Sequence, residues 1–247
     1  MKISVITATI DPDASVARTV ESVTMQTHPD IEHLLIDGVK DREAPRKLLG
    51  KRLYHFPKGI YEALNFGISN ATGDIIGLVH GGDCLASHDI LKKVNDAFEE
   101  DPSLDFVYGD VRYVSGKTRR KGRIYYAGNF RPKYLAYGMA PPHPSLYIRR
   151  EAAEKVGPYR EHYIISGDTD MWMRIFADKT LKGRYLPEIF VEMTTGGIST
   201  SLKGRLYANN RDKLKALRLN GYKANPLALL GKYFIMLRDI FTRQSRK

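Results

Sequence analysis

The stretch DIIGLVHGGD, residues 74–83, reads as a buried strand that ends abruptly in a histidine, two glycines and a carboxylate. Residues 74–79 form a short apolar run of the kind found in strands that are covered on both faces. Glycines after such a strand permit close approach of the backbone to a ligand, and carboxylate oxygens bind divalent cations. Taken alone, Gly-Gly-Asp is more typical of a tight turn after a strand. The surrounding sequence has to decide between the two interpretations.

Strands alternate with helices on both sides of this stretch. Apolar runs predict strands, and apolar residues at helical spacing predict helices. The expected strands are 2–9, 31–37, 52–56, 74–79 and 105–110, and the expected helices are 13–26, 58–71, 87–100 and about 168–177. This order predicts an α/β fold with a mostly parallel sheet and helices on both faces.

Two less regular regions complete the predicted organisation. Residues 111–116 and 123–128 predict a hairpin around the basic loop KTRRKGR, which spans residues 117–123. Residues 203–220 and 226–242 predict two further helices at the end of the chain.

Four polar clusters fall at predicted strand ends or just before a predicted helix. Ligands of open α/β sheets bind beyond the carboxyl ends of the strands. The clusters are Thr7–Asp11, Asp37-Gly38, His80–Asp83 and the loop that leads to Asp168. The Gly-Gly-Asp stretch therefore lies where a ligand is expected.

The composition is that of a globular protein. Of the 247 residues, 43% are hydrophobic and 27% are charged, and the single cysteine, Cys84, excludes an internal disulfide framework. The first ten residues lack the layout of a signal peptide, and the longest apolar candidate, residues 225–237, is interrupted by Lys232. We expect a cytoplasmic protein without a membrane span.

Positive charge is concentrated at the end of the chain. Residues 201–247 carry 12 of the 39 Lys and Arg but only two of the 28 Asp and Glu, so this segment is +10 and residues 1–200 are +1. Such asymmetry predicts a contact with an anionic surface, and the apolar residues of 226–242 fit the interface of a membrane. An amphipathic helix that packs on the rest of the protein explains the same pattern. No nucleic-acid-binding motif accompanies the basic residues, so nucleic acid is not an expected partner.

Several motifs occur together and in order: SVITATID, EHLLIDG, KGIYEALNFGISNATGDIIGLVHGGD, HPSLYIRREAAEKVG, SGDTDMWMR and GGIS. In this order they resemble glycosyltransferase family 2, in particular its bacterial surface-polysaccharide branch, over about residues 2–200. Residues 58–83 are the most specific part. The resemblance implies a GT-A fold, a nucleotide-diphosphate-sugar donor with UDP favoured, Mn²⁺ or Mg²⁺, and inversion at the anomeric carbon. It also implies a glycan or lipid-linked acceptor and a place at the inner face of the cell membrane.

The resemblance divides the chain into a catalytic domain, residues 1–200, and a basic helical extension, residues 201–247. Within the domain, about 1–110 form the nucleotide-sugar half and 111–200 the acceptor half. It also implies roles for individual residues. Asp83 holds the metal, with His80 as a further candidate ligand, and Asp168 is the catalytic base. The expected donor contacts are Thr7, Ala8, Thr9, Asp37, Asn65, Gly82 and Asp83, and His143 and Gly197 are expected to contact the acceptor or the diphosphate.

The sequence departs from the family pattern at two positions. Family members usually have acids where this chain has Gly82 and Gly167. A non-catalytic relative that binds nucleotide sugars is therefore a second hypothesis. A sugar nucleotidyltransferase is a third, although the first loop lacks the glycine and lysine that such enzymes use.

Overall fold

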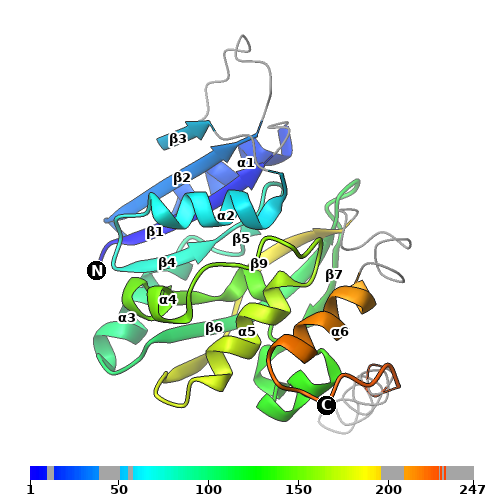
Figure 1. Ribbon diagram of the computed structural model, residues 1–247. Coiled ribbons are helices and arrows are strands. Elements are labelled where there is room, and N and C mark those ends of the chain that lie inside the picture. The colour runs from blue at the N-terminus through cyan, green and yellow to red at the C-terminus, as the bar shows by residue number, and fades with distance from the viewer. Residues whose placement is uncertain are drawn as a thin grey trace, which may run out of the picture.

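The computed structural model describes residues 1–9, 14–38, 51–54, 58–195 and 209–227, together with residues 229 and 231. Its strands form one mixed sheet in the order β3-β2-β1-β4-β8-β6-β9-β5, with β7 paired to β6 (Figure 1). The predicted α/β class and the mostly parallel arrangement of the first strands are confirmed, because β3, β2, β1 and β4 are all parallel neighbours.

The first part of the chain follows the predicted alternation. Its elements are β1 (Ile3–Thr9), α1 (Ala14–Thr24), β2 (Ile31–Asp37), β3 (Lys51–Tyr54), α2 (Ile60–Ser69) and β4 (Ile75–Leu78). The strands formed where the apolar runs predicted them, and their side chains are almost completely buried in β1 and β4.

The second part is more irregular. Its regular elements are β5 (Cys84–Leu85), α3 (Ile90–Glu100), β6 (Phe106–Ser115), β7 (Lys121–Tyr125), β8 (Tyr147–Arg149), α4 (Arg150–Val156), α5 (Gly167–Ala177), β9 (Gly183–Thr195) and α6 (Asn209–Leu219). Short 3-10 helices lie at Ala127–Asn129, Pro132–Tyr137 and His143–Ser145.

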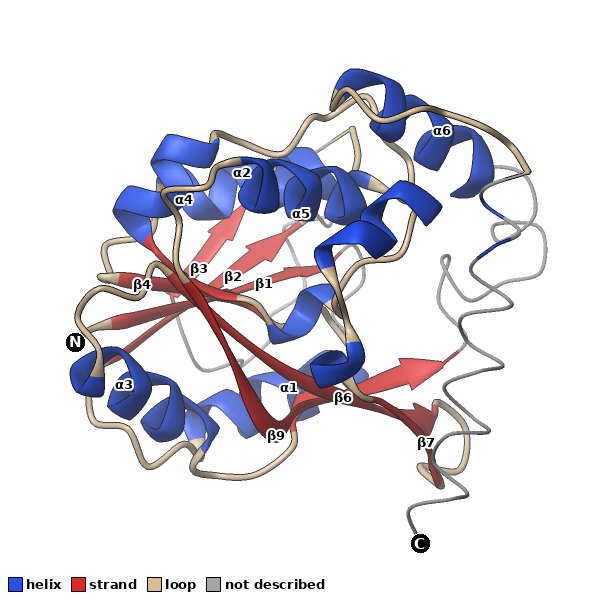
Figure 2. Ribbon diagram, turned by 90° about the horizontal axis from the view of Figure 1, so that it is seen from below, coloured by secondary structure: helices blue, strands red, loops and turns tan. Residues whose placement is uncertain are grey.

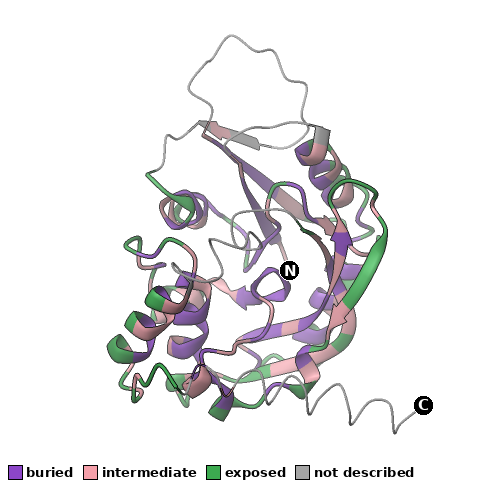
Figure 3. Ribbon diagram, turned by 90° about the vertical axis from the view of Figure 1, so that its right-hand side faces the viewer, coloured by how far each residue is buried: buried purple, intermediate pink, exposed green. Residues whose placement is uncertain are grey.

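Helices cover both faces of the sheet. Figure 2 shows α2, α4 and α5 on one face and α1 and α3 on the other. Each face has its own hydrophobic core, and Trp172 of α5 and Phe98 of α3 are among the largest completely buried side chains. Figure 3 shows buried residues concentrated along the central strands and on the inward sides of the helices.

Two element boundaries differ from the sequence prediction. The strand predicted over 105–110 and the hairpin strand predicted over 111–116 form one strand, β6, because its backbone pairs with β9 as far as Ser115 and Thr195. The helix predicted from residue 87 begins at Ile90, since Cys84 and Leu85 pair with β9. The hairpin around the basic loop is confirmed as β6 and β7.

Strand β9 was not predicted, although it is the longest strand of the described part of the chain. Its residues 183–195 do not alternate cleanly between buried and exposed positions. The sequence pattern that would mark a half-buried strand is therefore missing.

The carboxyl end of β1 lies between the ends of its two neighbours. Gly38 donates its N–H to the carbonyl of Thr9 at 2.9 Å on the β2 side, and Gly81 donates to the carbonyl of Ala8 at 3.4 Å on the β4 side. The first three predicted polar clusters therefore meet at one edge of the sheet.

No helix among the described residues is long and apolar enough to cross a membrane. Helix α6 lies within the first of the two helices predicted after residue 200. Most of the second, residues 226–242, falls outside the described residues.

Candidate active site

Strands β1 and β2 present the predicted nucleotide-binding residues. Asp37 ends β2 opposite Thr9 of β1 and is only 1% exposed. Thr7 is completely buried, and its hydroxyl lies 3.0 Å from Nε2 of His33 on β2. The side chain of Thr7 is thus engaged within the sheet, whereas Thr9 and Asp37 stand at its edge.

Asp83 is buried in the loop that follows β4. It is 6% exposed, and its Oδ1 accepts the backbone N–H of Thr194 on β9 at 2.8 Å. Burial raises the pKa of Asp83 from 3.8 to about 7, and the Thr194 N–H and the positive charge of Arg119 oppose this shift. A carboxylate in this setting gains stability from a cation, because burial disfavours its charged form.

Gly82 gives this loop its shape. Its φ is +95°, a left-handed conformation that side chains other than that of glycine rarely adopt. Its N–H donates to the hydroxyl of Thr19 at 2.9 Å, and its carbonyl accepts the hydroxyl of Thr194 at 2.6 Å. The backbone conformation accounts for a glycine at the position where the family resemblance implies an acid.

Arg119, from the β6–β7 hairpin, lies close to Asp83 and Thr194. Its guanidinium donates to the Thr194 hydroxyl at 3.1 Å and lies 3.7 Å from the Glu192 carboxylate. Arg119 also has a φ of 54°. Backbone strain of this kind costs about 1–3 kcal/mol and clusters at functional sites. The sequence had indicated only a basic loop here.

His80 and His143 come close enough to interact electrostatically. The backbone N–H of Asp83 donates to the carbonyl of His80 at 2.9 Å. Burial, together with the nearby His80, lowers the pKa of His143 to about 3, so His143 is a neutral imidazole at physiological pH. Its Nε2 lies 2.5 Å from the hydroxyl of Tyr159.

Asp168 begins α5 beside a pair of stacked tyrosines. The rings of Tyr61 and Tyr159 stack with centroids 5.7 Å apart, and the Tyr61 hydroxyl accepts the N–H of Gly167 at 2.8 Å. Burial raises the pKa of Asp168, and the positive charge of Lys213 opposes the rise. A base with a raised pKa is better matched to proton transfer near neutral pH.

Gly167 has a steric reason to be glycine. A Cβ built on it would lie 2.6 Å from the Tyr61 ring, well inside van der Waals contact. A side chain at position 167 therefore requires the Tyr61 ring or the start of α5 to shift.

The surroundings of Asp83 and Asp168 share the two histidines and the stacked tyrosines. The backbone N–H of Asp83 donates to the carbonyl of His80, and His143, which interacts electrostatically with His80, is hydrogen-bonded to Tyr159. Tyr159 stacks on Tyr61, whose hydroxyl accepts the N–H of Gly167, the residue before Asp168. The neighbours of the predicted metal ligand and those of the predicted base thus lie in the same part of the molecule.

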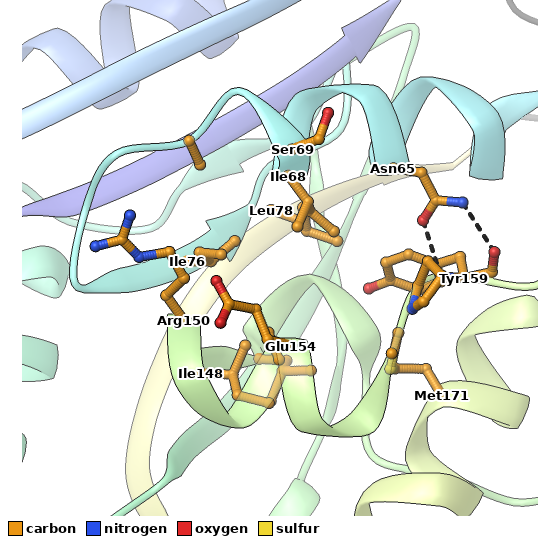
Figure 4. A pocket seen from close by; sticks show the side chains of 15 residues that line it. Asn65, Ile68, Ser69, Ile76, Leu78, Ile148, Arg150, Glu154, Tyr159 and Met171 are labelled. Carbon is orange, nitrogen blue, oxygen red and sulfur yellow. Dashed lines mark hydrogen bonds between the residues drawn. The ribbon is translucent and has the colours of Figure 1, made fainter.

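Asn65 lies elsewhere. Its amide donates to the carbonyl of Tyr159 at 2.8 Å and to Glu161 at 3.0 Å, and it accepts the N–H of Tyr159 at 2.8 Å. Figure 4 shows Asn65 at a cavity of about 410 Å³ between α2 and α4, whose lining includes Tyr159 but not Asp37, Asp83 or Asp168. Both the nitrogen and the oxygen of the Asn65 amide are thus hydrogen-bonded within the protein, and these bonds hold the loop before α5 in place.

The comparisons with known proteins identify the family of this chain. A family model described as Glycosyl transferase family 2 matches residues 4–157, more than half of the chain. The chain belongs to glycosyl transferase family 2. It is also similar to a PGL/p-HBAD biosynthesis glycosyltransferase of Mycobacterium bovis, with 29% identity over 211 residues, 81% of this chain and 79% of the relative.

Solved structures share the fold of this glycosyltransferase. TarS of S. aureus, residues 1–349 in complex with UDP-GlcNAc, matches with a TM-score of 0.69 and 17% identity over 89% of this chain. The mannosyltransferase PcManGT of Pyrobaculum calidifontis, in complex with GDP-Man and Mn²⁺, matches with a TM-score of 0.60 and 15% identity over 87% of this chain. This chain spans 65% and 64% of those two chains. The predicted GT-A fold is thereby confirmed.

The residues of this glycosyltransferase suit a divalent ion that takes most of its ligands from a substrate. Among the residues that the structure describes, no group of three His, Cys, Asp or Glu side chains is placed to hold a metal. The buried carboxylate of Asp83 is a candidate ligand, and Mg²⁺ in enzymes is commonly bound by one or two carboxylates plus substrate phosphates. Gly197 lies outside the described residues.

Sequence reasoning missed several residues of this site. Thr194, Arg119 and Tyr159 reach it only through the fold, and none of them lies in one of the motifs of the family resemblance. Tyr61 lies in the 58–83 block, which was a signal that its neighbourhood mattered, but no role was assigned to it.

Proposed function

We propose that this glycosyltransferase is an inverting, metal-dependent enzyme that moves a sugar from a nucleotide-diphosphate sugar, with UDP favoured, to a glycan or lipid-linked acceptor in surface polysaccharide biosynthesis. The observation that carries the proposal is a pair of carboxylates, Asp83 after β4 and Asp168 in α5, whose pKa values are both raised by burial. A buried carboxylate of this kind suits a cation or a transferred proton.

The donor would bind at the edge of the sheet formed by the carboxyl ends of β1, β2 and β4. The Asp37 carboxylate suits the imide N–H of a uracil ring, since an ionised carboxylate only accepts hydrogen bonds. The backbone of Thr7, Ala8 and Thr9 lines the nucleotide, and Gly82 lets the diphosphate approach the main chain.

Asp83 would hold Mn²⁺ or Mg²⁺ together with the diphosphate oxygens, with His80 as a further ligand. When bound, such an ion supplies positive charge that offsets the charge on the departing diphosphate. Arg119 contributes a second positive charge next to Asp83. These positive charges stabilise the departing diphosphate most strongly in a site from which water is excluded.

Asp168 acts as the base. Its carboxylate accepts the proton of the acceptor hydroxyl while the hydroxyl oxygen forms a bond to the anomeric carbon from the face opposite the diphosphate. The bond from that carbon to the diphosphate oxygen breaks, and the bonding electrons leave with the diphosphate. One displacement of this kind inverts the configuration. His143, neutral and hydrogen-bonded to Tyr159, holds the ring that packs beside Asp168.

The enzyme would work in the cytoplasm at the inner face of the cell membrane. The basic segment 201–247 would face an anionic leaflet, where each Lys or Arg contributes about 1 kcal/mol. Flotation of the full chain with vesicles of phosphatidylglycerol, compared with vesicles of phosphatidylcholine, tests the proposed membrane contact separately from the reaction. Equal flotation with both kinds of vesicle would contradict a contact with an anionic leaflet.

A non-catalytic nucleotide-sugar-binding relative is the second candidate, since Gly82 and Gly167 replace acids. The structure gives both glycines a local reason: the φ of Gly82 and the contact of Gly167 with Tyr61. Both reasons are compatible with a working site, which favours the enzyme.

The test is release of UDP from a panel of UDP-sugars in the presence of Mn²⁺, followed by the anomeric configuration of the product. We expect turnover with at least one donor and an inverted product. Binding of donors without turnover, whichever acceptor is added, would support the second candidate. A product of retained configuration would contradict the single-displacement mechanism.

A further inference from the structure

Helix α6 is attached to the loop that presents Asp168. Asp212 in its first turn is 6% exposed, and its Oδ2 accepts the backbone N–H groups of Ile164 at 2.8 Å and Ile165 at 2.9 Å. These two residues lie three and four positions before Asp168 along the chain. A buried carboxylate that accepts two main-chain N–H groups fixes the path of the backbone between them.

The far end of α6 is attached to α5 as well. Asn220 donates its amide to Oδ1 of Asp170 at 2.8 Å. Asp170 is completely buried and pairs with Arg160 at 2.6 Å and with Arg174 at 3.1 Å. Figure 1 shows α6 alongside α5, so the helix is fastened to the base region at both ends.

Lys213, next to Asp212, brings a positive charge to the base. It is the cation whose interaction favours the ionised form of Asp168. Among the described residues, the groups near Asp168 also include Tyr61 from α2, Tyr159 from the preceding loop and Thr169 from α5. Lys213 is thus the group that carries a full positive charge among these neighbours.

We propose that α6 is part of the catalytic site: Asp212 is a positioning residue that sets the backbone before Asp168, and the same helix carries Lys213 on the side of that carboxylate. This rests on the proposed function, in which Asp168 is the base. It gives the segment after residue 200 a role in the chemistry, separate from any contact with a membrane.

The donor side of the site lies apart from α6 along the chain and in the sheet. The residues that would hold the nucleotide and the diphosphate belong to β1, β2 and the loop after β4, whereas α6 contacts α5 and the loop before it. A substitution that disturbs only the contacts of α6 should therefore lower the turnover rate and leave the affinity for the donor unchanged.

The experiment compares the full-length Asp212→Ala, Asp212→Asn and Lys213→Met variants with Asp168→Asn. The measurements are UDP release from the best donor of the panel, binding of UDP by calorimetry, and the urea midpoint. Matched controls are Asp96→Ala and Lys92→Met, an exposed ion pair on α3 with a 2.6 Å contact. The control variants should keep the wild-type rate.

We expect Asp212→Ala to lower kcat about 10- to 100-fold with UDP affinity unchanged, because small misplacements of a reacting group cost that much. Asp212→Asn keeps an oxygen acceptor and should lose less. Lys213→Met should move the acid limb of the pH–rate profile to higher pH, because Asp168 then keeps its proton to a higher pH, and Lys213→Arg should restore the limb.

Two results would overturn the proposal. The first is that Asp212→Ala weakens UDP binding and lowers stability, and that its fall in kcat is no larger than these two losses explain. The other, which applies even if Asp212→Ala does not fold, is an unchanged acid limb in Lys213→Met. Failure of the proposed function looks different, because Asp168→Asn would then keep the wild-type rate.

Discussion

The carboxylate of Asp83 accepts the backbone N–H of Thr194 at 2.8 Å, although the two residues are 111 positions apart in the chain. The loop after β4 and the end of β9 are therefore one structural unit. Its stability depends on the charge of Asp83, on the shape that Gly82 allows and on the hydroxyl of Thr194.

The charge of Asp83 should cost the free protein stability at high pH. The pKa of Asp83 is raised from 3.8 to about 7 in the folded state. The folded protein therefore holds more protons than the unfolded chain between these values, and the free energy of unfolding falls as the pH rises through them. Asp83→Asn removes this loss, which is at most about 4 kcal/mol.

Urea denaturation at pH 5 and pH 8 measures the effect. We expect Asp83→Asn to gain stability relative to the wild type on going from pH 5 to pH 8, without metal or nucleotide. The same difference at both pH values would show that Asp83 is not held at a raised pKa.

Thr194 should matter through its hydroxyl. The hydroxyl donates to the carbonyl of Gly82 at 2.6 Å and accepts from Arg119 at 3.1 Å. Thr194→Val leaves the carbonyl and the guanidinium without this partner, at a cost of about 1–3 kcal/mol. We expect a lower urea midpoint and weaker UDP binding, both largely restored in Thr194→Ser. Equal behaviour of the two variants would mean that the hydroxyl has no such role.

Gly167 should tolerate no side chain. The ring of Tyr61 lies 2.6 Å from the position of a Cβ there, so Gly167→Ala forces the ring or the start of α5 to move. We expect a loss of about 1–3 kcal/mol in stability, as for other overpacked sites. Gly59→Ala, immediately before α2, is the matched control, since nothing lies within 4 Å of its Cβ position. Equal urea midpoints for the two variants would contradict the steric account.

Asp170 should be essential for folding. It is completely buried between two arginines, and Asp170→Asn leaves those cations with a neutral partner. Breaking a buried ion pair in this way costs about 3–5 kcal/mol. Thermal unfolding of Asp170→Asn should show a large fall in Tm, whereas Asp178→Asn, which pairs with the half-exposed Lys155, should change little. A small effect at Asp170 would show that the pair is compensated elsewhere.

The first strands and their ligand edge were predictable because each depends on a local pattern. Apolar runs such as 31–37 and 74–79 are buried by neighbours on both faces, and parallel strands bring their ends together whatever the loops do. Thr9, Asp37 and Asp83 could therefore be assigned to one edge before the fold was known.

The surroundings of Asp83 and Asp168 were not predictable in this way. Strand β9 has no clear alternation, so nothing in the sequence indicated that Thr194 would meet Asp83. The loop before Asp168 is held by Asp212, 44 positions further along the chain. Such contacts are set by how helices pack on the sheet, and single-chain patterns carry no record of that packing.

The most direct test of the central claim is the rate of UDP release by the wild type, by Asp83→Asn, by Asp168→Asn and by the double variant, all with Mn²⁺ and one UDP-sugar. If both carboxylates serve one reaction, each single variant should fall at least about 100-fold and the double variant should fall little further, because residues that act as a unit are not additive. Wild-type release by either single variant, with its fold intact, would contradict the claim.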